Sequence, residues 1–273
     1  MAERLPTAAF LSEVRESYED HSNILGLFDK IAFSAATVLT GPKGIGKSLA
    51  VATWAARAKV PLVTFDCSED VRRAHLYGSF VLRGSETPFV LGPIGTAVEI
   101  ANEVGRCILN LEECNSLVPQ MQKALNPITD WRRRIEMPEA GLVIALKPEA
   151  QLWVVGSMNT SQYGGVYELN EDLKSRLRFI AMDYPGQAAE AKILKHRTDD
   201  PKLIGGLLTL AAESRQEKFG YALSTRDLTQ IIDDVKLCGL ETALWLMVSK
   251  FEPQHRSILT KRIVSIFDVK PKR

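Results

Sequence analysis

The chain has 273 residues, 45% of them hydrophobic, so it can bury a large core as one large domain with a small satellite or as two modest domains. Its formal net charge of +1 excludes a global attraction to nucleic acid or to a membrane surface, and such a contact would need a local patch. No apolar run approaches the roughly 20 residues of a membrane span and residues 1–6 lack a signal peptide's apolar centre, so we expect a cytoplasmic protein without membrane contact.

The first two thirds of the chain predict strands that alternate with helices. A helical lead-in is expected over residues 7–30, and turn residues between two short apolar runs predict a hairpin or loop insertion over residues 80–91. Strand–helix alternation is typical of a mostly parallel sheet with helices on both faces, which makes this an α/β fold. The five expected strands are 36–40, 61–65, 107–111, 152–157 and 179–182.

From Gly186 onward the pattern is helical only. No strand pattern follows Tyr184-Pro185, and Asp200-Pro201 is a typical helix start. We therefore predict two domains, an α/β domain with its helical lead-in over residues 1–185 and an all-helical lid over residues 186–273. The lid helices are expected at 187–197, 201–215, 225–237, 240–251 and 254–267.

Residues 41–48 read Gly-Pro-Lys-Gly-Ile-Gly-Lys-Ser, a complete GxxxxGK[ST] phosphate-binding loop. It follows an expected strand and precedes a strong helix former, the context that this motif requires. Lys47 is expected to reach the β- and γ-phosphates of ATP, and the Ser48 hydroxyl to ligate Mg²⁺. A glycine-rich turn without a ligand is the alternative. The expected nucleotide-binding residues are Gly41, Pro42, Lys43, Gly44, Ile45, Gly46, Lys47, Ser48 and Leu49.

Two acids close the third expected strand, in the order Glu112-Glu113. Bound MgATP needs one carboxylate that organises the metal and another that activates water, and we assign these roles to Glu112 and Glu113. Two features depart from the usual pattern, because Glu112 stands where aspartate is usual and Asn110 interrupts an otherwise apolar strand. Acids that open a helix and favour its dipole are the alternative interpretation.

Asn159 follows the fourth expected strand and is placed to sense the γ-phosphate and the attacking water. An asparagine after a strand is more often a turn former. Its position behind the acidic pair favours the sensor interpretation.

These motifs together resemble an AAA+ ATPase of the MoxR class, and within it the CbbQ/NorQ/GvpN group. The resemblance covers residues 30–235, and its order and spacing are more specific than any one motif. Besides the loop, the acids and Asn159, it is carried by residues 66–70, 86–93, 126–133, 172–179 and 223–226.

The resemblance implies a homo-oligomeric ring, usually of six subunits, with ATP at the interface and an arginine from the neighbour completing the site. Arg178 matches the arginine-finger position best and Arg176 is the second candidate, both expected to project from the end of the preceding helix. Arg226 matches the sensor arginine of the lid, in a helix start that resembles a capping box. Solvent-exposed arginines at helix ends are the alternative.

The resemblance further implies a motor that uses ATP hydrolysis to remodel or activate a partner protein, a chaperone or activase, commonly together with a von Willebrand factor A-domain adaptor. Residues 75–93 and 131–145 resemble the family's inserted hairpins and loops, which face the pore or the client protein. Two alternatives stay open: a nucleic-acid-associated NTPase subunit of a restriction or replication system, which the run Arg132-Arg133-Arg134 beside Trp131 permits but the overall charge disfavours, and a low-turnover ATP-dependent assembly switch, which Glu112 permits.

Overall fold

The computed structural model describes residues 4–12, 18–159, 167–216 and 220–272. Within these ranges, no helix combines the length and the apolarity that a bilayer crossing requires. The chain forms two compact units, which are described separately. The first comprises Met1–Glu16, Asn23–Gly41 and Gly46–Met182, and the second comprises Ser17–Ser22, Pro42–Ile45 and Asp183–Arg273.

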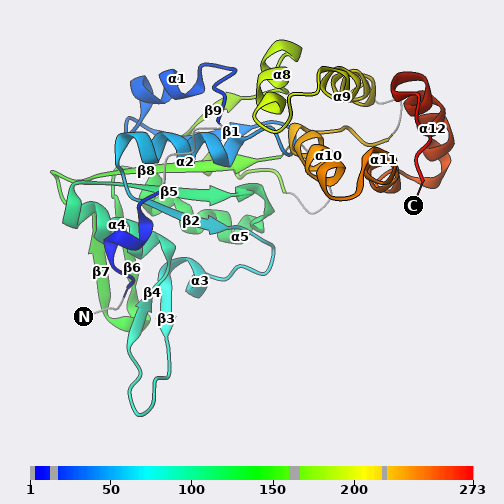
Figure 1. The fold of residues 1–273 in the computed structure, drawn as a ribbon. Helices are drawn as coiled ribbons and strands as arrows, with labels where there is room; N and C mark the ends of the chain where they lie inside the picture. The colour runs from blue at the N-terminus through cyan, green and yellow to red at the C-terminus, as the bar shows by residue number, and fades with distance from the viewer. Residues whose placement is uncertain (1–3, 13–17, 160–166, 217–219, 273) are drawn as a thin grey trace. The chain divides into compact units, whose positions relative to one another are not determined.

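A five-stranded sheet forms the centre of the first unit (Figure 1). All its strand pairs are parallel, in the order β2-β5-β8-β1-β9. The α/β fold with a five-stranded parallel sheet is therefore confirmed. Because the strands are parallel, their carboxyl ends meet at one edge of the sheet, where ligands bind in open α/β folds. The strands are β1 (Ala36–Thr40), β2 (Leu62–Asp66), β5 (Arg106–Glu112), β8 (Gln151–Met158) and β9 (Leu177–Ala181).

Aromatic side chains fill one face of the sheet, beneath α1 (Ile24–Ile31) and α2 (Lys47–Ala58). The rings of Phe28 and Trp54 both meet Trp153 of β8 edge to face, with centroids 5.2 and 5.3 Å apart, the geometry that aromatic pairs prefer. This cluster anchors α2 and with it the loop before it. Of the expected lead-in helix, a short 3-10 turn η1 (Thr7–Phe10) and α1 are present, and residues 13–17 lie outside the described residues.

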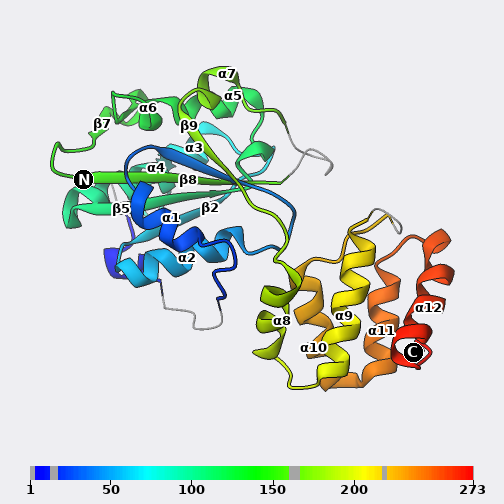
Figure 2. The same cartoon turned by 90° about the horizontal axis from the view of Figure 1, so that it is seen from above.

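The opposite face is covered by α4 (Pro93–Val104), whose Ile94, Ala97 and Ile100 are fully buried in one apolar cluster with Leu109 and Leu111 of β5. Figure 2 shows α5 and α6 on the side of the sheet away from α1 and α2. Short elements complete this unit: α3 (Arg73–Tyr77), α5 (Pro119–Gln122), α6 (Asn126–Thr129), α7 (Glu171–Lys174), η2 (Cys114–Ser116), η3 (Lys123–Leu125) and η4 (Pro138–Ala140).

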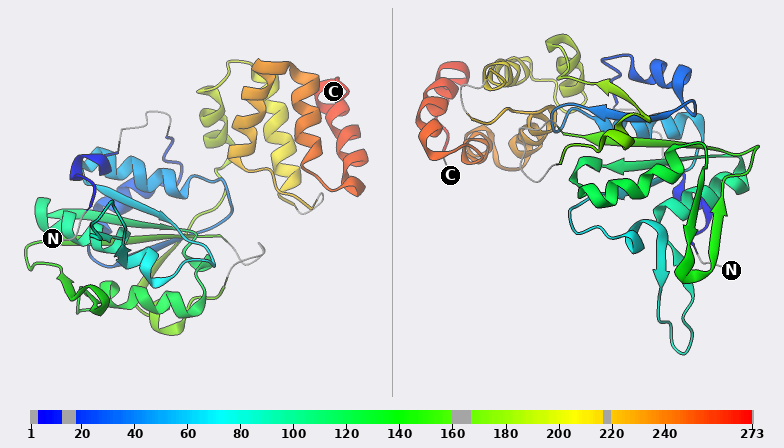
Figure 3. Two further views of the ribbon diagram at one scale, coloured as in Figure 1. Left: turned by 90° about the horizontal axis from the view of Figure 1, so that it is seen from below. Right: turned by 180° about the vertical axis from the view of Figure 1, so that it is seen from behind.

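Two antiparallel hairpins extend from the same unit (Figures 1 and 3). One pairs β3 (Gly78–Phe80) with β4 (Phe89–Leu91), and the other pairs β6 (Arg134–Met137) with β7 (Leu142–Ala145). They occupy the two segments that the sequence assigns to insertions.

The second unit is helical, as expected for the C-terminal region (Figure 2). Asp200 caps the second of its helices by accepting the backbone N–H groups of Lys202 and Leu203. Fully buried leucine, isoleucine and phenylalanine side chains pack between the helices. The helices are α8 (Gln187–Lys195), α9 (Pro201–Ser214), α10 (Thr225–Cys238), α11 (Leu240–Ser249) and α12 (Pro253–Phe267).

Candidate active site

The loop at 41–48 joins β1 to α2, as its sequence context predicts. Gly46 caps α2 with φ of 95° and Gly44 has φ of 73°, values that a side chain with a Cβ resists. Lys47 is then the first residue of α2 and Ser48 the second. Helix α2 therefore begins at the motif's functional side chains. Its first backbone N–H groups have no partner within the helix and are available to a ligand.

Lys47 is buried and lies between the ends of two strands. Its Nζ donates to the carbonyl oxygen of Gly41 at 2.8 Å and to Asn159 Oδ1 at 3.2 Å. The second contact arises because β1 and β8 are adjacent and in register, with Thr40 opposite Met158, so the residues after them meet. Lys47 and Asn159, 112 positions apart and both assigned to the γ-phosphate from the sequence, are thereby brought into contact.

Glu112 ends β5 with its carboxylate held by three donors. Ser48 Oγ and Ser157 Oγ donate to Oε2 at 2.5 and 2.7 Å, and Asn110 Nδ2 donates to Oε1 at 2.6 Å. These donors come from α2, β8 and β5. The two residues expected to serve the metal, Ser48 and Glu112, are thus in direct contact.

Glu113 has left-handed backbone angles, φ 51° and ψ 45°. For a residue with a Cβ this conformation costs roughly 1–2 kcal/mol, and such strain concentrates at functional sites. Its N–H donates to Ser157 Oγ at 3.1 Å, and its carbonyl accepts from Ser116 at 2.7 Å. The turn at Glu113 ends the alternation of side chains between the two faces of β5. Glu113 Oε1 accepts a hydrogen bond from Asn159 Nδ2 at 3.0 Å.

Arg178 and Arg176 lie apart from this cluster. Arg178 is inside β9, opposite Thr37 near the start of β1, and its Nη1 donates to Ser34 Oγ at 3.1 Å. The expectation that Arg178 projects from a helix end is therefore wrong, because β9 begins at Leu177. Arg176 follows α7 and donates to the carbonyl oxygen of Asp172. Both arginines lie toward the amino ends of the strands, whereas Lys47 lies beyond the carboxyl ends.

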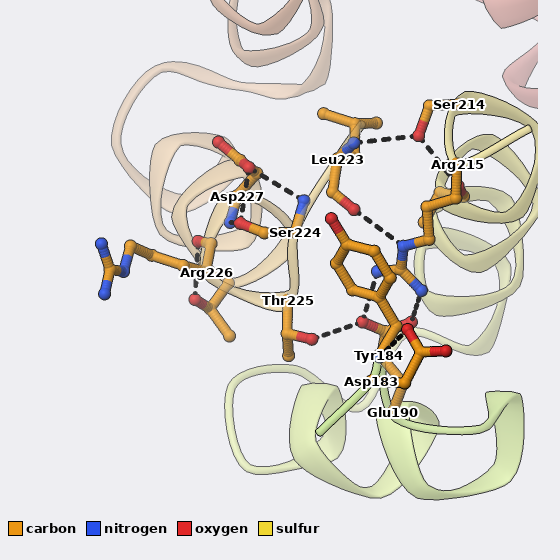
Figure 4. Close-up of polar contacts among 12 residues, drawn as sticks. Asp183, Tyr184, Glu190, Ser214, Arg215, Leu223, Ser224, Thr225, Arg226 and Asp227 are labelled. Carbon is orange, nitrogen blue, oxygen red and sulfur yellow. Dashed lines mark hydrogen bonds and ion pairs between the residues drawn. The ribbon is translucent and has the colours of Figure 1, made fainter. Parts of the chain in front are cut away.

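Arg226 lies in the first turn of α10 in the second unit. Ser224 and Asp227 form the capping box that the sequence indicates: Ser224 N–H donates to Asp227 Oδ2 at 2.9 Å, and Asp227 N–H donates to Ser224 Oγ at 3.3 Å. In Figure 4 the Arg226 guanidinium points away from the polar cluster around Glu190 and Arg215.

That cluster fixes the chain before α10 and was not found from the sequence. Arg215 binds the buried Glu190 through two hydrogen bonds of 2.7 and 2.9 Å and donates to the carbonyl of Leu223 at 2.9 Å. Thr225 Oγ1 donates to Glu190 Oε1 at 2.6 Å, and the Tyr184 ring centroid is 4.0 Å from Arg215 Cζ (Figure 4). A buried Glu–Arg pair needs such full satisfaction to be tolerated. The only signal in the sequence is a charged residue inside otherwise apolar helix faces.

Ser157 and Asn110 were also not identified as site residues from the sequence. Asn110 had a readable signal, because residues two apart on a strand share a face and Glu112 is two residues further on. Ser157 had none, since its contact with both acids follows from the position of β8 beside β5.

The side chains that gather here suit Mg²⁺ and a phosphate chain. The hydroxyl of Ser48 and the carboxylate of Glu112 are hard oxygen donors, and Mg²⁺ is usually held by one or two such groups, substrate phosphates and water. Lys47 and the start of α2 supply the positive charge and N–H groups that phosphates require. Within the described ranges, no three His, Cys, Asp or Glu side chains group as metal ligands. The remaining ligands would come from phosphate and water.

Comparison with known proteins identifies the family. The sequence pattern of the AAA domain family, dynein-related subfamily, matches residues 36–177. Protein CbbQ of Hydrogenophilus thermoluteolus is 30% identical over 196 residues, which cover 71% of this chain and 70% of that protein. Protein NorQ of Paracoccus denitrificans (strain Pd 1222) is 33% identical over 184 residues, covering 65% of this chain and 64% of that protein.

A crystal structure from Cytophaga hutchinsonii ATCC 33406 has the same fold, with a TM-score of 0.52 at 14% identity over 93% of this chain and 82% of that chain. The family match spans β1, the loop, both acids and Asn159, which are the residues that meet at the sheet edge. This protein therefore belongs to the AAA domain family and, as a relative of CbbQ and NorQ, to its MoxR class.

Proposed function

We propose that this chain hydrolyses MgATP as a subunit of a six-membered homo-oligomeric ring and uses the energy to remodel or activate a partner protein. The observation that carries the proposal is the continuous chain of hydrogen bonds from Lys47 through Asn159 to Glu113. It joins the group that would bind the γ-phosphate to the group that would activate water. A phosphate-binding loop without hydrolysis has no need for this link.

Each residue has a distinct part in the proposed reaction. Lys47 binds the β- and γ-phosphates, and Ser48 and Glu112 hold Mg²⁺, which when bound neutralises charge on the phosphate oxygens. Glu113 orients the attacking water and accepts its proton. Asn159 holds the Glu113 carboxylate and senses the γ-phosphate.

The placement of Arg178 and Arg176 supports completion of the site by a neighbouring subunit. Arg178 lies opposite Thr37, three residues before the end of β1, which is about 10 Å along the strand. An arginine at that end of its own sheet is poorly placed for its own Lys47 but available to an adjacent copy. A guanidinium delivered this way would stabilise charge that develops during phosphoryl transfer. Arg226 is the proposed sensor of the helical unit.

The two hairpins of the first unit support a protein client. Apolar side chains are exposed on the hairpins and just before β6: 74% of Leu82, 64% of Val143 and 89% of Trp131 are accessible. Contiguous exposed apolar surface commonly marks protein contacts, and we propose that these side chains contribute to such a surface. A von Willebrand factor A-domain adaptor remains the expected additional partner.

The basic run beside Trp131 gives little support to a nucleic-acid partner. Arg132 is paired with Asp130 at 2.7 Å, and Arg134 is paired with Glu136 at 2.8 Å. These acids offset part of the positive charge that phosphate binding would need. We therefore favour the protein-remodelling function.

The test compares ATP turnover of the wild type with Glu113→Gln. The substitution removes the proton acceptor but keeps a hydrogen-bonding side chain, and we expect kcat to fall by roughly 10²–10⁴-fold with ATP binding retained. Glu149→Gln, an exposed acid just before β8 at the opposite edge of the sheet, is the matched control and should turn over like the wild type.

Equal and negligible turnover in the wild type and in Glu113→Gln, with ATP-dependent assembly in both, would contradict the motor and favour the assembly switch. Loss of ATP binding in Glu113→Gln would contradict the role assigned to Glu113.

A further inference from the structure

Asn110 lies in the middle of β5, where its neighbours Ile108, Leu109 and Leu111 are buried apolar side chains. It is itself only 2% exposed. Burying an amide in an apolar strand is unfavourable unless its polar atoms are hydrogen-bonded. Among the described residues, Asn110 Oδ1 has no hydrogen-bond partner, so the amide is retained in spite of this cost.

The Nδ2 group of this amide contacts Glu112. Residues 110 and 112 share one face of the strand, and Nδ2 donates to Glu112 Oε1 at 2.6 Å. The orientation of the amide follows from its partner, because an ionised carboxylate only accepts hydrogen bonds and would repel Oδ1. A short bond to a carboxylate is also stronger than one between neutral groups.

Glu112 needs such a contact because of its length. At this position the usual residue is aspartate, and glutamate adds one methylene and one rotatable bond. An unrestrained glutamate would spread its carboxylate over several rotamers. Asn110 holds Oε1, while Ser157 Oγ holds Oε2 from β8 at 2.7 Å. The longer acid is therefore held by side chains on two strands, β5 and β8.

The two anchors differ in what else they touch. Ser157 Oγ also accepts the N–H of Glu113 at 3.1 Å, so it contacts both acids. Among the described residues, the hydrogen bond of the Asn110 side chain is to Glu112 and not to Glu113. Substitution of Asn110 therefore removes a contact of Glu112, the acid proposed to serve the metal, and leaves the contacts of Glu113 in place.

We propose that Asn110 is a positioning residue that orients the Glu112 carboxylate toward Mg²⁺, and that it compensates for glutamate in place of aspartate at this position. The inference rests on the proposed function, because it assigns Mg²⁺ to Ser48 and Glu112. The departures at residues 110 and 112 then form one matched pair.

The test measures metal affinity directly and does not depend on turnover. Mn²⁺ is titrated into the protein saturated with ADP, and free Mn²⁺ is followed by electron paramagnetic resonance. Loss of a residue that orients a metal ligand weakens metal binding by about 10–100-fold, and we expect about 10-fold for Asn110→Leu. ADP affinity measured in EDTA should be unchanged, because Asn110 does not serve the phosphate loop.

Thr37→Val is the matched control. Thr37 is a fully buried polar residue of the neighbouring strand β1, and its hydroxyl donates to the carbonyl of Ala35 at 3.1 Å, away from both acids. The control should bind Mn²⁺ as the wild type does. If Asn110→Leu does not fold, Asn110→Ser replaces it: the shorter side chain stays polar but cannot reach Glu112 Oε1, and the same loss is expected.

The double variant Asn110→Leu/Glu112→Asp gives the sharpest result. It places the usual aspartate at position 112, after an apolar strand. Because the aspartate side chain is shorter, it needs no anchor, and we expect the double variant to recover most of the lost Mn²⁺ affinity. Wild-type affinity in Asn110→Leu, an equal loss in Thr37→Val, or no recovery in the double variant would each overturn the inference. Failure of the wild type to bind ADP with Mn²⁺ would instead contradict the proposed function itself.

Discussion

Asn159 Nδ2 donates to Glu113 Oε1 at 3.0 Å, and its Oδ1 accepts from Lys47 Nζ at 3.2 Å. One amide therefore holds the catalytic candidates on both sides. Asn159→Ala should lower kcat by roughly 10²–10³-fold, the usual cost of removing one positioned donor. Its ATP affinity should change little, because Lys47 keeps its bond to Gly41.

The measurement is steady-state ATP turnover together with ATP affinity. Asn102→Ala is the control, because Asn102 also bridges backbone groups, those of Ala145 and Lys147, but outside the site. A turnover for Asn159→Ala that matches the control would contradict its proposed role.

Arg178→Ala should retain ATP binding and lose roughly 10³–10⁵-fold in hydrolysis if its guanidinium serves a neighbouring subunit. Mixing Arg178→Ala with Glu113→Gln subunits should restore part of the activity, since some interfaces then combine an intact Arg178 with an intact Glu113. Arg57→Ala, an exposed arginine in the last turn of α2, is the control and should stay active. No recovery in mixtures that still assemble would exclude Arg178 as the shared group, and Arg176→Ala would then be tested in the same way.

Gly156→Ala should strain β8 beside Ser157. The added Cβ would lie 2.9 Å from Cys114 Sγ and 3.3 Å from Val38 Cγ2, and overpacking of this kind typically costs about 1–3 kcal/mol. Burial raises the pKa of the Cys114 thiol to about 12, so this sulfur is a neutral packing group. Urea unfolding measures the loss of stability.

Cys114→Ala in the same chain removes the closest atom and should recover much of the stability lost by Gly156→Ala. Equal stability of Gly156→Ala and the wild type would show that the strand moves freely here, which would contradict the rigid placement of Ser157.

Asp227 should make the stability of the helical unit depend on acid pH. Burial alone would raise the pKa of Asp227, but hydrogen bonds from Lys250 and Ser224 outweigh it and hold the pKa below its usual range. Because the folded pKa is lower than the unfolded one, this stabilisation is complete above the ordinary aspartate pKa of about 4 and is lost as pH falls below it.

Urea unfolding between about pH 2 and pH 7 tests this, with Trp245 of α11 reporting on the helical unit. Asp227→Asn should be less stable than the wild type at pH 7, and the difference should shrink toward pH 2. Asp233→Asn is the control, because Asp233 lies on the same helix as Asp227 but is partly exposed, where it pairs with Arg197. A difference that does not change with pH would contradict the ionic contribution of Asp227.

The fold was largely predictable because its signals are local. The strand before residue 41, the glycines at 44 and 46 and the helix former after Ser48 depend on turn and helix propensities over a few residues. The capping box at Ser224 and Asp227 is likewise a local pattern. Arg178 was misplaced because the start of β9 is set by its pairing with β1, with Leu177 opposite Ala36, and no local pattern encodes that pairing.

The candidate site was predictable in its members and not in its connections. Lys47, Glu113 and Asn159 each follow from a motif, whereas the hydrogen bonds among them depend on β1, β5 and β8 lying side by side in one register. Asn110 interrupts an apolar strand, and its contact with Glu112, which only the fold reveals, gives it a place in the site.

By itself the sequence determined the five strands of the sheet, the helices of the C-terminal region, the class of fold and the members of the candidate site, since hydrophobic periodicity and turn chemistry act along the chain. Only the tertiary structure decided how Ser157 joins both acids, how Glu190 and Arg215 support the turn before α10, and at which end of the sheet Arg178 lies. These relationships join residues distant in sequence, and their geometry is set by strand register and helix packing, which depend on the whole fold.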